Sequence, residues 1–449
     1  MSGNTLRKSG AWRIAAQARP GVVRPQNDRE LRACLAPSPH HATPVRPMGA
    51  GSSSTDCTSA TAGTVIDLSA MNRIRDIDLH DYTVTVQPGV TIRALSDELA
   101  AQGLELEGSH DLMNRTVGGA VASGCIGPSI GDDGSLFASQ LCAARVITPN
   151  GGMLTVGPEK ENLLSALRLS YGMLGVFSEL TLRIRPVRHF EARHRRCTIA
   201  QFSAAAEKLA RTNIGVRFCL MPFRDRVYLD LRRYNDETSN SSRLPWRLKD
   251  WGESTVLPHV FKSLNRIVPV AGVRYRLIDE LSSITQGLVN NRLVGRGSSS
   301  ATLTVGGRPQ HLNYSTWFFP AADFAIVVQA YRKFCLRVHE ENGFRCDMPT
   351  MGFRLRRDQS ALLSPLFDEP MIALRAVSTQ SAGWEDFAID FGEFAEHWGG
   401  VPLFNQSRSL SPDHARQVFG ERLEFFRKMR RRLDPEDRMM NPFLSQYFL

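Results

Sequence analysis

A glycine- and serine-rich turn, Arg46-Pro-Met-Gly-Ala-Gly-Ser-Ser-Ser-Thr55, constrains the fold of this chain more than any other stretch. It follows a strand-like piece at 43–45 and precedes another at 64–68. Glycines 49 and 51 allow positive φ and a close approach of the backbone to another group. The serines after them leave backbone N–H groups uncovered, and a concave row of such donors suits a pyrophosphate. An ordinary polar turn is the alternative, so the rest of the chain has to decide.

Length and cysteine usage favour a globular, reduced protein of two domains. The chain has 449 residues, more than one ordinary core supports. It contains no run of eighteen apolar residues, so no membrane-spanning helix is expected. Residues 1–10 are basic and lack an apolar core, which argues against a secretory signal. The eight cysteines form no Cys-x-x-Cys pair, which predicts cytoplasmic thiols and no metal site.

The chain is basic, with a net charge of 55 − 45 = +10. Basic clusters occur at 193–196, 354–357 and 427–432. A basic face attracts nucleic acid, anionic lipid or an acidic substrate. Because no zinc-finger spacing or RNP pattern accompanies the charge, nucleic acid is not an expected partner. Solvated helix faces explain the clusters better.

Two more glycine-containing segments follow the first. The segment Asn114–Gly131 has almost no bulky side chains, so its backbone is expected to lie against something flat or phosphorylated. A flexible surface loop is the alternative. The segment Gly172–Ile184 runs from a glycine turn into a strand with alternating apolar residues.

The remaining pattern predicts an α+β protein. Around residues 22–31 we expect a strand and then a helix capped near Asn27 or Asp28, and Thr91 is expected to cap a helix over 90–101. Strand-like and helical pieces after about 187 indicate a separate α+β domain. Residues 244–291 are open to three interpretations: a helical insertion packed on its own domain, a substrate lid, or a membrane-surface helix. Further expected elements are strands at 71–78, 83–89, 137–148, 153–156, 216–221 and 226–231, and helices at 163–171 and 321–339.

Taken in order, these pieces resemble the FAD-linked oxidoreductases of the vanillyl-alcohol-oxidase superfamily, which carry a PCMH-type FAD-binding domain. Residues 46–55 resemble the family's phosphate loop, 65–72 the strand after it, 116–131 the second flavin-contacting loop, and 171–176 a later glycine turn. The resemblance implies a two-domain α+β fold: an FAD-binding domain over 15–188, a substrate (cap) domain over 189–395, and a C-terminal segment over 396–449 that completes the flavin site. The cofactor-binding residues it implies are Met48, Gly49, Ala50, Gly51, Ser52, Ser53, Ser54, Thr116, Gly118, Gly119, Ser123, Gly124, Gly127 and Val176.

The C-terminal half resembles the sugar-oxidising branch, which includes aldonolactone, alditol and decaprenylphosphoryl-ribose oxidases. Many relatives attach the flavin through a histidine where this chain has Ser52, so the resemblance implies non-covalent FAD. Alditol oxidases hold their substrate with a glutamate and a lysine, at whose positions this chain has Gly352 and Gly400. These departures argue against a polyol or aldonolactone substrate.

In this family FAD accepts a hydride from a C–H next to a hydroxyl, and electrons pass on to O2 or a quinone. The hydroxyl proton requires a base. His397 is the expected base and Arg354 the expected clamp for the substrate oxygen, against the alternatives of a structural histidine and a surface charge. Asn405, Gln406, Tyr314 and Trp317 are further candidates for the substrate pocket. Other readings of the small-molecule substrate are a lipid-linked sugar, reached by peripheral membrane contact, and a natural product.

Overall fold

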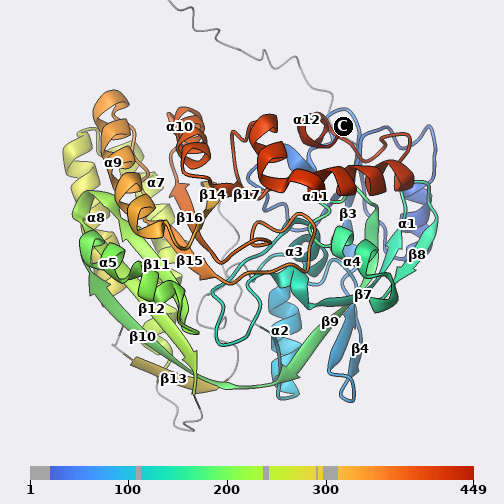
Figure 1. Cartoon of the computed structure of the whole chain (residues 1–449), viewed down its shortest axis with the longest axis horizontal. Helices are drawn as coiled ribbons and strands as arrows, with labels where there is room; N and C mark the ends of the chain where they lie inside the picture. The colour runs from blue at the N-terminus through green and yellow to red at the C-terminus, as the bar shows by residue number, and fades with distance from the viewer. Residues whose placement is uncertain (1–20, 108–112, 236–241, 290–291, 297–311) are drawn as a thin grey trace, which may run out of the picture.

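The computed structural model describes residues 21–107, 113–235, 242–289, 292–296 and 312–449. The described chain forms two lobes side by side, joined at the base of the molecule by the short connection at 187–188 (Figure 1). The first lobe contains residues 21–186, and the second contains residues 189–402. Residues 15–20 of the predicted FAD-binding domain lie outside the described residues.

The first lobe is built on two sheets. A small parallel sheet has the order β1-β3-β2, and a larger sheet has the order β4-β5-β9-β7-β8, with β6 paired to β9. The strands are β1 (Gly21–Val23), β2 (Val45–Met48), β3 (Thr64–Asp67), β4 (Ile74–Asp78), β5 (Thr83–Val86), β6 (Leu104–Leu106), β7 (Leu141–Ile147), β8 (Met153–Val156) and β9 (Val176–Pro186). The helices are α1 (Asp28–Leu35), α2 (Ile92–Ala101), α3 (Val117–Ser123) and α4 (Glu161–Leu167).

Local capping places these helices where the sequence predicts them. The Asn27 side chain accepts a hydrogen bond from the Glu30 amide at the start of α1, and Thr91 accepts one from the Ala94 amide at the start of α2. The strand predicted over 137–148 begins later, because 137–140 form a 3-10 turn, η3 (Phe137–Gln140).

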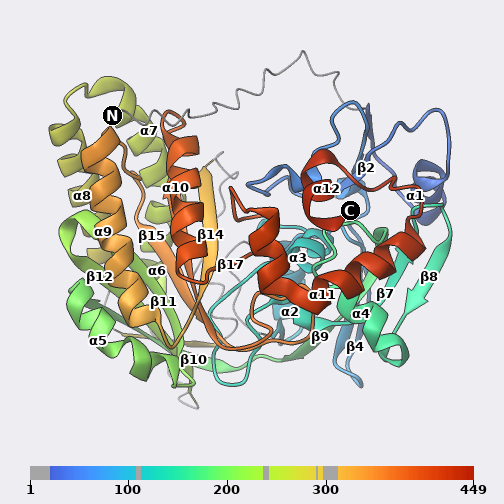
Figure 2. The same ribbon diagram turned by 45° about the horizontal axis from the view of Figure 1, so that its top comes forward.

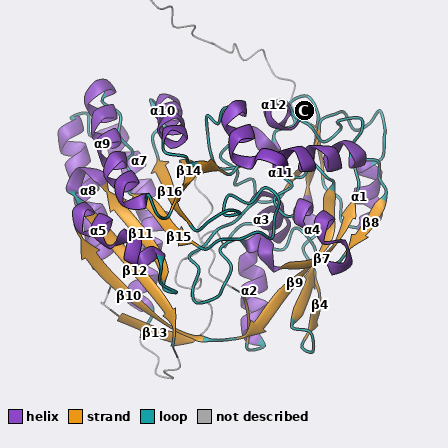
Figure 3. Ribbon diagram, in the orientation of Figure 1, coloured by secondary structure: helices purple, strands orange, loops and turns teal. Residues whose placement is uncertain are grey.

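The second lobe is an antiparallel sheet with the order β13-β10-β12-β11-β15-β16-β14-β17 in the described residues. Its strands are β10 (His189–Cys197), β11 (Gly215–Met221), β12 (Arg226–Tyr234), β13 (Arg292–Arg296), β14 (Asn313–Pro320), β15 (Thr350–Leu355), β16 (Met371–Ser378) and β17 (Val401–Pro402). The helices α5 (Ile199–Ala210), α9 (Phe324–Asn342) and α10 (Trp384–His397) pack on one face of this sheet. Figure 3 shows these helices standing along the sheet.

Residues 244–287 form a helical insertion that packs against the other face of the sheet, where Gln286 contacts the Cys219 thiol. Its helices are α6 (Leu244–Trp251), α7 (Leu257–Ile267) and α8 (Ala271–Gly287), with a π-helical turn η6 (Gly252–Val256) between the first two. The structure thus favours the packed insertion among the three interpretations of this segment. No helix among the described residues is long and apolar enough to cross a membrane.

The C-terminal segment joins the two lobes. Strand β17 pairs with β14 of the second lobe, and then α11 (Pro412–Leu433) and α12 (Pro442–Phe448) lie over the first lobe (Figure 2). The Arg438 guanidinium donates hydrogen bonds to the carbonyls of Leu35 and Pro149. The end of the chain is therefore built into the N-terminal lobe.

Candidate cofactor site

The three glycine-containing segments meet around one cavity of about 740 Å³, which is open to solvent. The segments around residues 47–58, 115–123 and 171–177 contribute most of its lining, with Leu68 and Pro88 beside them. They are far apart in the sequence and come together at the ends of β2 and β5 and at the start of β9. The resemblance based on these glycine segments predicts that they lie together at one site.

The first segment presents an uncovered row of backbone donors. The amides of residues 49–53 donate to no acceptor among the described residues, and all five residues line the cavity. Gly51 has φ +64°, which turns the chain sharply within this row. Consecutive N–H groups of this kind bind phosphate oxygens, so the row fits the diphosphate of a dinucleotide.

The glycines bring the segments into direct contact. A Cβ on Gly49 would lie 2.1 Å from the Thr116 Oγ1, and a Cβ on Gly118 would lie 2.6 Å from the Pro88 Cβ. The second segment, expected as a loop, instead begins as the short helix α3, because the Thr116 side chain caps it at the Gly119 amide. Its small residues leave a narrow slot, which suits a flat ligand.

A buried cation lies directly behind the first segment. Arg46 is fully buried and donates hydrogen bonds to the carbonyls of Met439 (2.5 Å), Cys57 (2.8 Å) and Tyr171. Burial lowers the pKa of Arg46 to about 10, so the group remains charged at neutral pH. It ties the first and third segments to the C-terminus and adds positive potential behind the cavity, which favours an anionic ligand.

The C-terminal segment closes the same loop from outside. The Ser54 amide donates to the Asn405 carbonyl (2.9 Å), and the Thr55 hydroxyl donates to the Phe404 carbonyl (2.6 Å). The Asn441 side-chain amide donates to the carbonyls of residues 56, 57 and 59. The phosphate-loop candidate is thus held in shape by residues that follow it by more than 340 positions.

Most residues expected at the cofactor lie around the cavity. Those that line it are Met48, Gly49, Ala50, Gly51, Ser52, Ser53, Thr116, Gly118, Gly119, Ser123 and Val176. Ser54 instead holds the C-terminal segment, and neither Gly124 nor Gly127 lines the cavity. The Gly124 carbonyl accepts from Arg115 and Gln406, and the Gly127 amide donates to the Ser135 carbonyl.

Several lining residues have no signal of their own in the sequence. They are Pro47, Cys57, Thr58, Leu68, Pro88, Arg115, Ala122, Tyr171, Gly172, Gly175 and Phe177. Tyr171 and the two glycines belong to the third glycine turn, so extending that motif on both sides would have found them. Pro47, Arg115 and Ala122 lie within the first two glycine-containing segments. The others are ordinary apolar or polar residues that only the packing of the chain brings to the cavity.

Next to the cavity, the second lobe and the C-terminal segment form a largely buried polar patch: Tyr314 and Thr316 of β14, Arg375 of β16, and Gln406. Arg375 donates to the Thr316 hydroxyl (3.0 Å) and to the Gln406 side-chain carbonyl (3.1 Å). The Tyr314 hydroxyl donates to the Ser52 carbonyl of the cavity loop. Arg375 is the cation that sequence reasoning missed, because one arginine in a buried strand resembles any other until the strands are paired.

Neither residue expected to do chemistry lines the cavity. His397 is exposed at the last position of α10. Arg354 is 3% exposed and donates to the Ser129 carbonyl at 3.4 Å, joining the two lobes. Burial, helped by the charge of Arg356, lowers the pKa of Arg354 to about 10. Arg354 pairs with Ile372, so strand alternation places it on the opposite face of the sheet from Arg375.

The two glycines that replace charged residues have structural reasons. A Cβ on Gly352 would lie 1.9 Å from the ring of Phe218, so a longer side chain has no room there. A Cβ on Gly400 would lie 2.8 Å from the Ala395 carbonyl oxygen, to which the Gly400 amide donates. Both positions belong to the packing of the second lobe.

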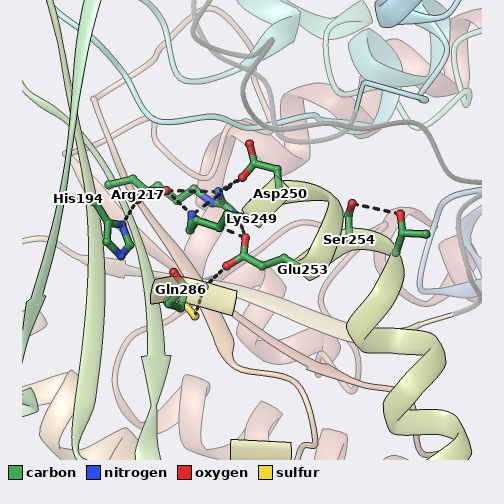
Figure 4. A network of polar contacts seen from close by, with 10 residues as sticks. His194, Arg217, Lys249, Asp250, Glu253, Ser254 and Gln286 are labelled. Atoms are coloured by element: carbon green, nitrogen blue, oxygen red, sulfur yellow. Dashed lines mark hydrogen bonds and ion pairs between the residues drawn. The ribbon is translucent and has the colours of Figure 1, made fainter. Parts of the chain in front are cut away.

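A second polar cluster lies apart from the cavity, between the sheet and the helical insertion (Figure 4). Asp230 of β12 accepts from the Lys249 ammonium (2.9 Å) and lies 2.7 Å from the His194 Nδ1. Arg217 of β11 pairs with Glu253 of the π-helical turn at 2.9 Å. These groups hold α6 and η6 on the sheet through buried charges.

The pKa values of this cluster diverge. Burial alone would raise the pKa of Asp230, but Lys249, His194 and Arg217 hold it well below its ordinary value. Asp250 is 2% exposed, and neither of its oxygens accepts a hydrogen bond from the described residues. Burial therefore raises the pKa of Asp250 to about 7, although Lys249 lies 3.9 Å away.

A glycine-lined slot with a row of backbone donors, backed by a buried arginine and facing a separate antiparallel sheet, defines a two-lobed dinucleotide-binding protein. Residues 20–157 match the FAD binding domain model, and the cofactor is FAD. Residues 180–447 match the D-arabinono-1,4-lactone oxidase model, and the chain belongs to that family.

Curated relatives agree with this assignment. The chain is 29% identical over 216 residues to the L-gulono-1,4-lactone dehydrogenase of Mycobacterium tuberculosis, covering 48% of this chain and 49% of that protein. It is 22% identical to the L-gulonolactone oxidase of Bos taurus, covering 94% of each chain. The alignment thus spans only about half the length of the first of these relatives.

Solved structures show the same fold. A cholesterol oxidase from Brevibacterium sterolicum superposes with a TM-score of 0.77 at 13% identity, covering 95% of this chain and 94% of that chain. At this identity the likeness concerns the fold alone.

Proposed function

We propose that this protein is an FAD-dependent oxidoreductase that removes a hydride from a C–H next to a hydroxyl of a small sugar-like molecule, with aldonolactones as the first substrate class. The observation that carries the proposal is the position of the polar patch, Tyr314, Thr316, Arg375 and Gln406, beside the cofactor cavity. When bound, FAD supplies the hydride acceptor. The names of the relatives support the choice of lactones, which revises the expectation drawn from Gly352 and Gly400.

The roles of this chain's residues follow from the contacts. The amides of residues 49–53 hold the diphosphate, with Arg46 behind them, and the slot between the glycine segments holds flat rings. Arg375 donates to a substrate hydroxyl or lactone oxygen. Its guanidinium is held in a fixed orientation for this by the buried Gln406 carbonyl and Thr316 hydroxyl, which accept hydrogen bonds from it. His397 is not part of this proposal, because it is exposed.

Anaerobic reduction of the flavin tests the substrate class. The purified holoenzyme is mixed with a panel of 1,4-aldonolactones, alditols, 2-hydroxy acids and apolar alcohols, and the flavin absorbance is followed. Bleaching by one or more lactones supports the proposal. Bleaching by apolar alcohols alone would contradict aldonolactones as the substrate class and indicate an apolar alcohol instead.

Arg375→Lys sharpens the assignment of the patch. Lysine retains the charge but not the planar fork, so we expect KM for the bleaching substrate to rise about tenfold or more. Arg354→Lys is the matched control, since Arg354 lies on the other face of the sheet, and its KM should stay within about twofold of wild type. Equal changes in the two variants would contradict the role of Arg375.

Two properties of the cofactor belong to the proposal. FAD is bound without a covalent link, since Ser52 cannot form the bond that a histidine forms. After acid precipitation the yellow colour should remain in the supernatant, and colour in the pellet would contradict this. The electron acceptor is O2 or a quinone, and the photoreduced enzyme should reoxidise in air or with an added quinone.

As a second proposal, we propose that the protein is cytoplasmic and makes a peripheral contact with a membrane surface. Five apolar side chains of α8 and the residues that flank it are exposed, and Arg274 and Arg276 lie between Val273 and Leu277 among them. Basic and apolar residues together favour an anionic lipid surface. The five apolar residues are Val270, Val273, Leu277, Ile284 and Leu288, each 42–61% exposed.

Flotation with vesicles tests this contact. Vesicles containing phosphatidylserine should carry the protein, and pure phosphatidylcholine vesicles should carry much less. Ile284→Ser should weaken flotation, while Ile326→Ser, at an equally exposed position on α9, should not. Flotation that is absent, or equal in both variants, would contradict a membrane role for α8.

A further inference from the structure

The cavity loop is held not only by its own lobe but also by one hydroxyl from the second lobe. Tyr314 lies on β14, and its hydroxyl donates to the Ser52 carbonyl at 2.5 Å. Ser52 lies in the middle of the row of uncovered amides. A side chain of the substrate-side sheet therefore contacts the backbone of the cofactor loop.

Peptide geometry gives this contact a specific consequence. The peptide bond between residues 52 and 53 is trans, since the described chain has its one cis bond at Thr43–Pro44. In a trans peptide the C=O and the following N–H point in opposite directions. Because Tyr314 holds the Ser52 carbonyl on the side of the second lobe, the Ser53 N–H is turned the other way, toward the cavity that Ser53 lines.

The hydroxyl is itself held in place. The Arg115 Nη2 donates to the Tyr314 oxygen (3.3 Å), and the Arg115 Nη1 donates to the Gly124 carbonyl (2.5 Å) at the end of α3. The Arg375 guanidinium lies 5.6 Å from the centre of the Tyr314 ring. Gln406 donates to the same Gly124 carbonyl (3.2 Å). Tyr314 is thus the centre of a network that includes both lobes and the C-terminal segment.

We infer that Tyr314 is a positioning residue for the diphosphate of FAD, acting through the orientation of the 52–53 peptide. The second lobe thereby supplies part of the cofactor site without touching the cofactor. Without the hydroxyl, the Ser52 carbonyl loses its donor and the peptide is free to rotate, which removes one N–H from the phosphate row. The inference rests on the proposal that FAD occupies this cavity.

Binding of FAD, ADP and adenosine to the apoprotein tests the inference. Tyr314→Phe should weaken FAD and ADP alike by about tenfold, the size of one lost hydrogen bond. Adenosine, which lacks the diphosphate, should bind as in wild type within about twofold. The readout is quenching of flavin fluorescence for FAD and calorimetry for the other two.

Tyr331→Phe is the matched control. Tyr331 is a buried tyrosine of the same lobe and lies on α9. Its hydroxyl forms a hydrogen bond with the Thr350 hydroxyl at 2.8 Å. Removing the Tyr331 hydroxyl should lower Tm as much as removing the Tyr314 hydroxyl, but it should leave FAD affinity unchanged. The Tm values thereby separate a general loss of stability from a loss of positioning.

Three results would overturn the inference. Wild-type affinity of Tyr314→Phe for FAD and ADP would remove the role of Tyr314 while leaving the cofactor assignment intact. Equal weakening of adenosine would show a general disturbance of the site. Failure of the wild-type apoprotein to bind FAD would remove both the inference and the proposed function beneath it.

Discussion

The cofactor cavity and the charged cluster under the helical insertion are both polar sites, but the cavity is open to solvent and built mainly from backbone groups, whereas the cluster is buried and built from charged side chains. The cavity is lined mostly by glycines, small side chains and backbone amides, with Arg115 in its lining and Arg46 behind its loop. The cluster is made of charged side chains, with Lys249 at 2.9 Å and Arg217 at 3.5 Å from Asp230. Backbone donors are neutral and stay in place without a partner, whereas buried charges must be matched. The cavity is therefore suited to receive a ligand, and the cluster to hold the fold.

Removing one charge from the cluster should produce the largest effect. Asp230→Asn leaves Lys249 and Arg217 buried beside a neutral amide, so we expect a loss of about 3–5 kcal/mol in the free energy of unfolding. Urea denaturation measures this loss. FAD affinity of the folded fraction should change by less than about twofold.

Asp368→Asn is the control for this prediction. Asp368 also pairs with an arginine, Arg422 at 3.0 Å, but its side chain is 74% exposed. An exposed pair contributes less than about 1 kcal/mol. Similar losses in the two variants would show that burial does not distinguish the cluster.

Filling the contact between two cavity segments should give the next largest effect, and on binding rather than stability. The methyl group of Gly49→Ala would overlap the Thr116 Oγ1, so the two segments must separate. We expect FAD affinity to fall about 100-fold, which corresponds to about 2.7 kcal/mol.

Gly272→Ala is the control for the glycine prediction. Gly272 lies in α8 with open space around its Cβ position, so alanine should leave FAD affinity unchanged and slightly raise stability. Normal FAD affinity of Gly49→Ala would contradict the close contact between the segments.

Asp250 makes the cluster sensitive to pH in a way that the neutral cavity loop is not. Its pKa is about 7 in the folded protein and near its ordinary value of 3.8 when unfolded. Between these values the folded state holds one more proton, so stability falls as pH rises toward 7 and then levels. Between pH 5 and pH 6 the free energy of unfolding of wild type should fall by about 1.4 kcal/mol more than that of Asp250→Asn. A wild-type advantage that grows over this interval would contradict the raised pKa.

The same contrast explains what could be predicted from the sequence. Most residues that line the cavity belong to contiguous sequence motifs, so the loop at 46–55 and the two later glycine segments were predicted with most of their lining residues. The cluster takes one or two charged residues from each of several separate elements, and each one resembles a solvated charge in isolation. The sequence predicts Arg354 and gives no signal for Arg375 for a related reason: alternation tells which residues share a face, but only the paired sheet shows that Arg375 shares a face with Thr316 and Tyr314.

Gly51→Ala should produce the smallest effect and divide the cavity glycines into two kinds. Gly51 has φ +64° but open space around its Cβ position, so alanine there adds backbone strain without a clash. The left-handed conformation costs a non-glycine residue about 1 kcal/mol, and we expect FAD affinity to fall about fivefold. The FAD affinity of Gly51→Asn should fall less, because asparagine adopts this conformation more readily than alanine. If Gly51→Ala instead weakened FAD as much as Gly49→Ala, the cavity would depend on backbone conformation throughout, and the close contact of its segments would not be what sets affinity.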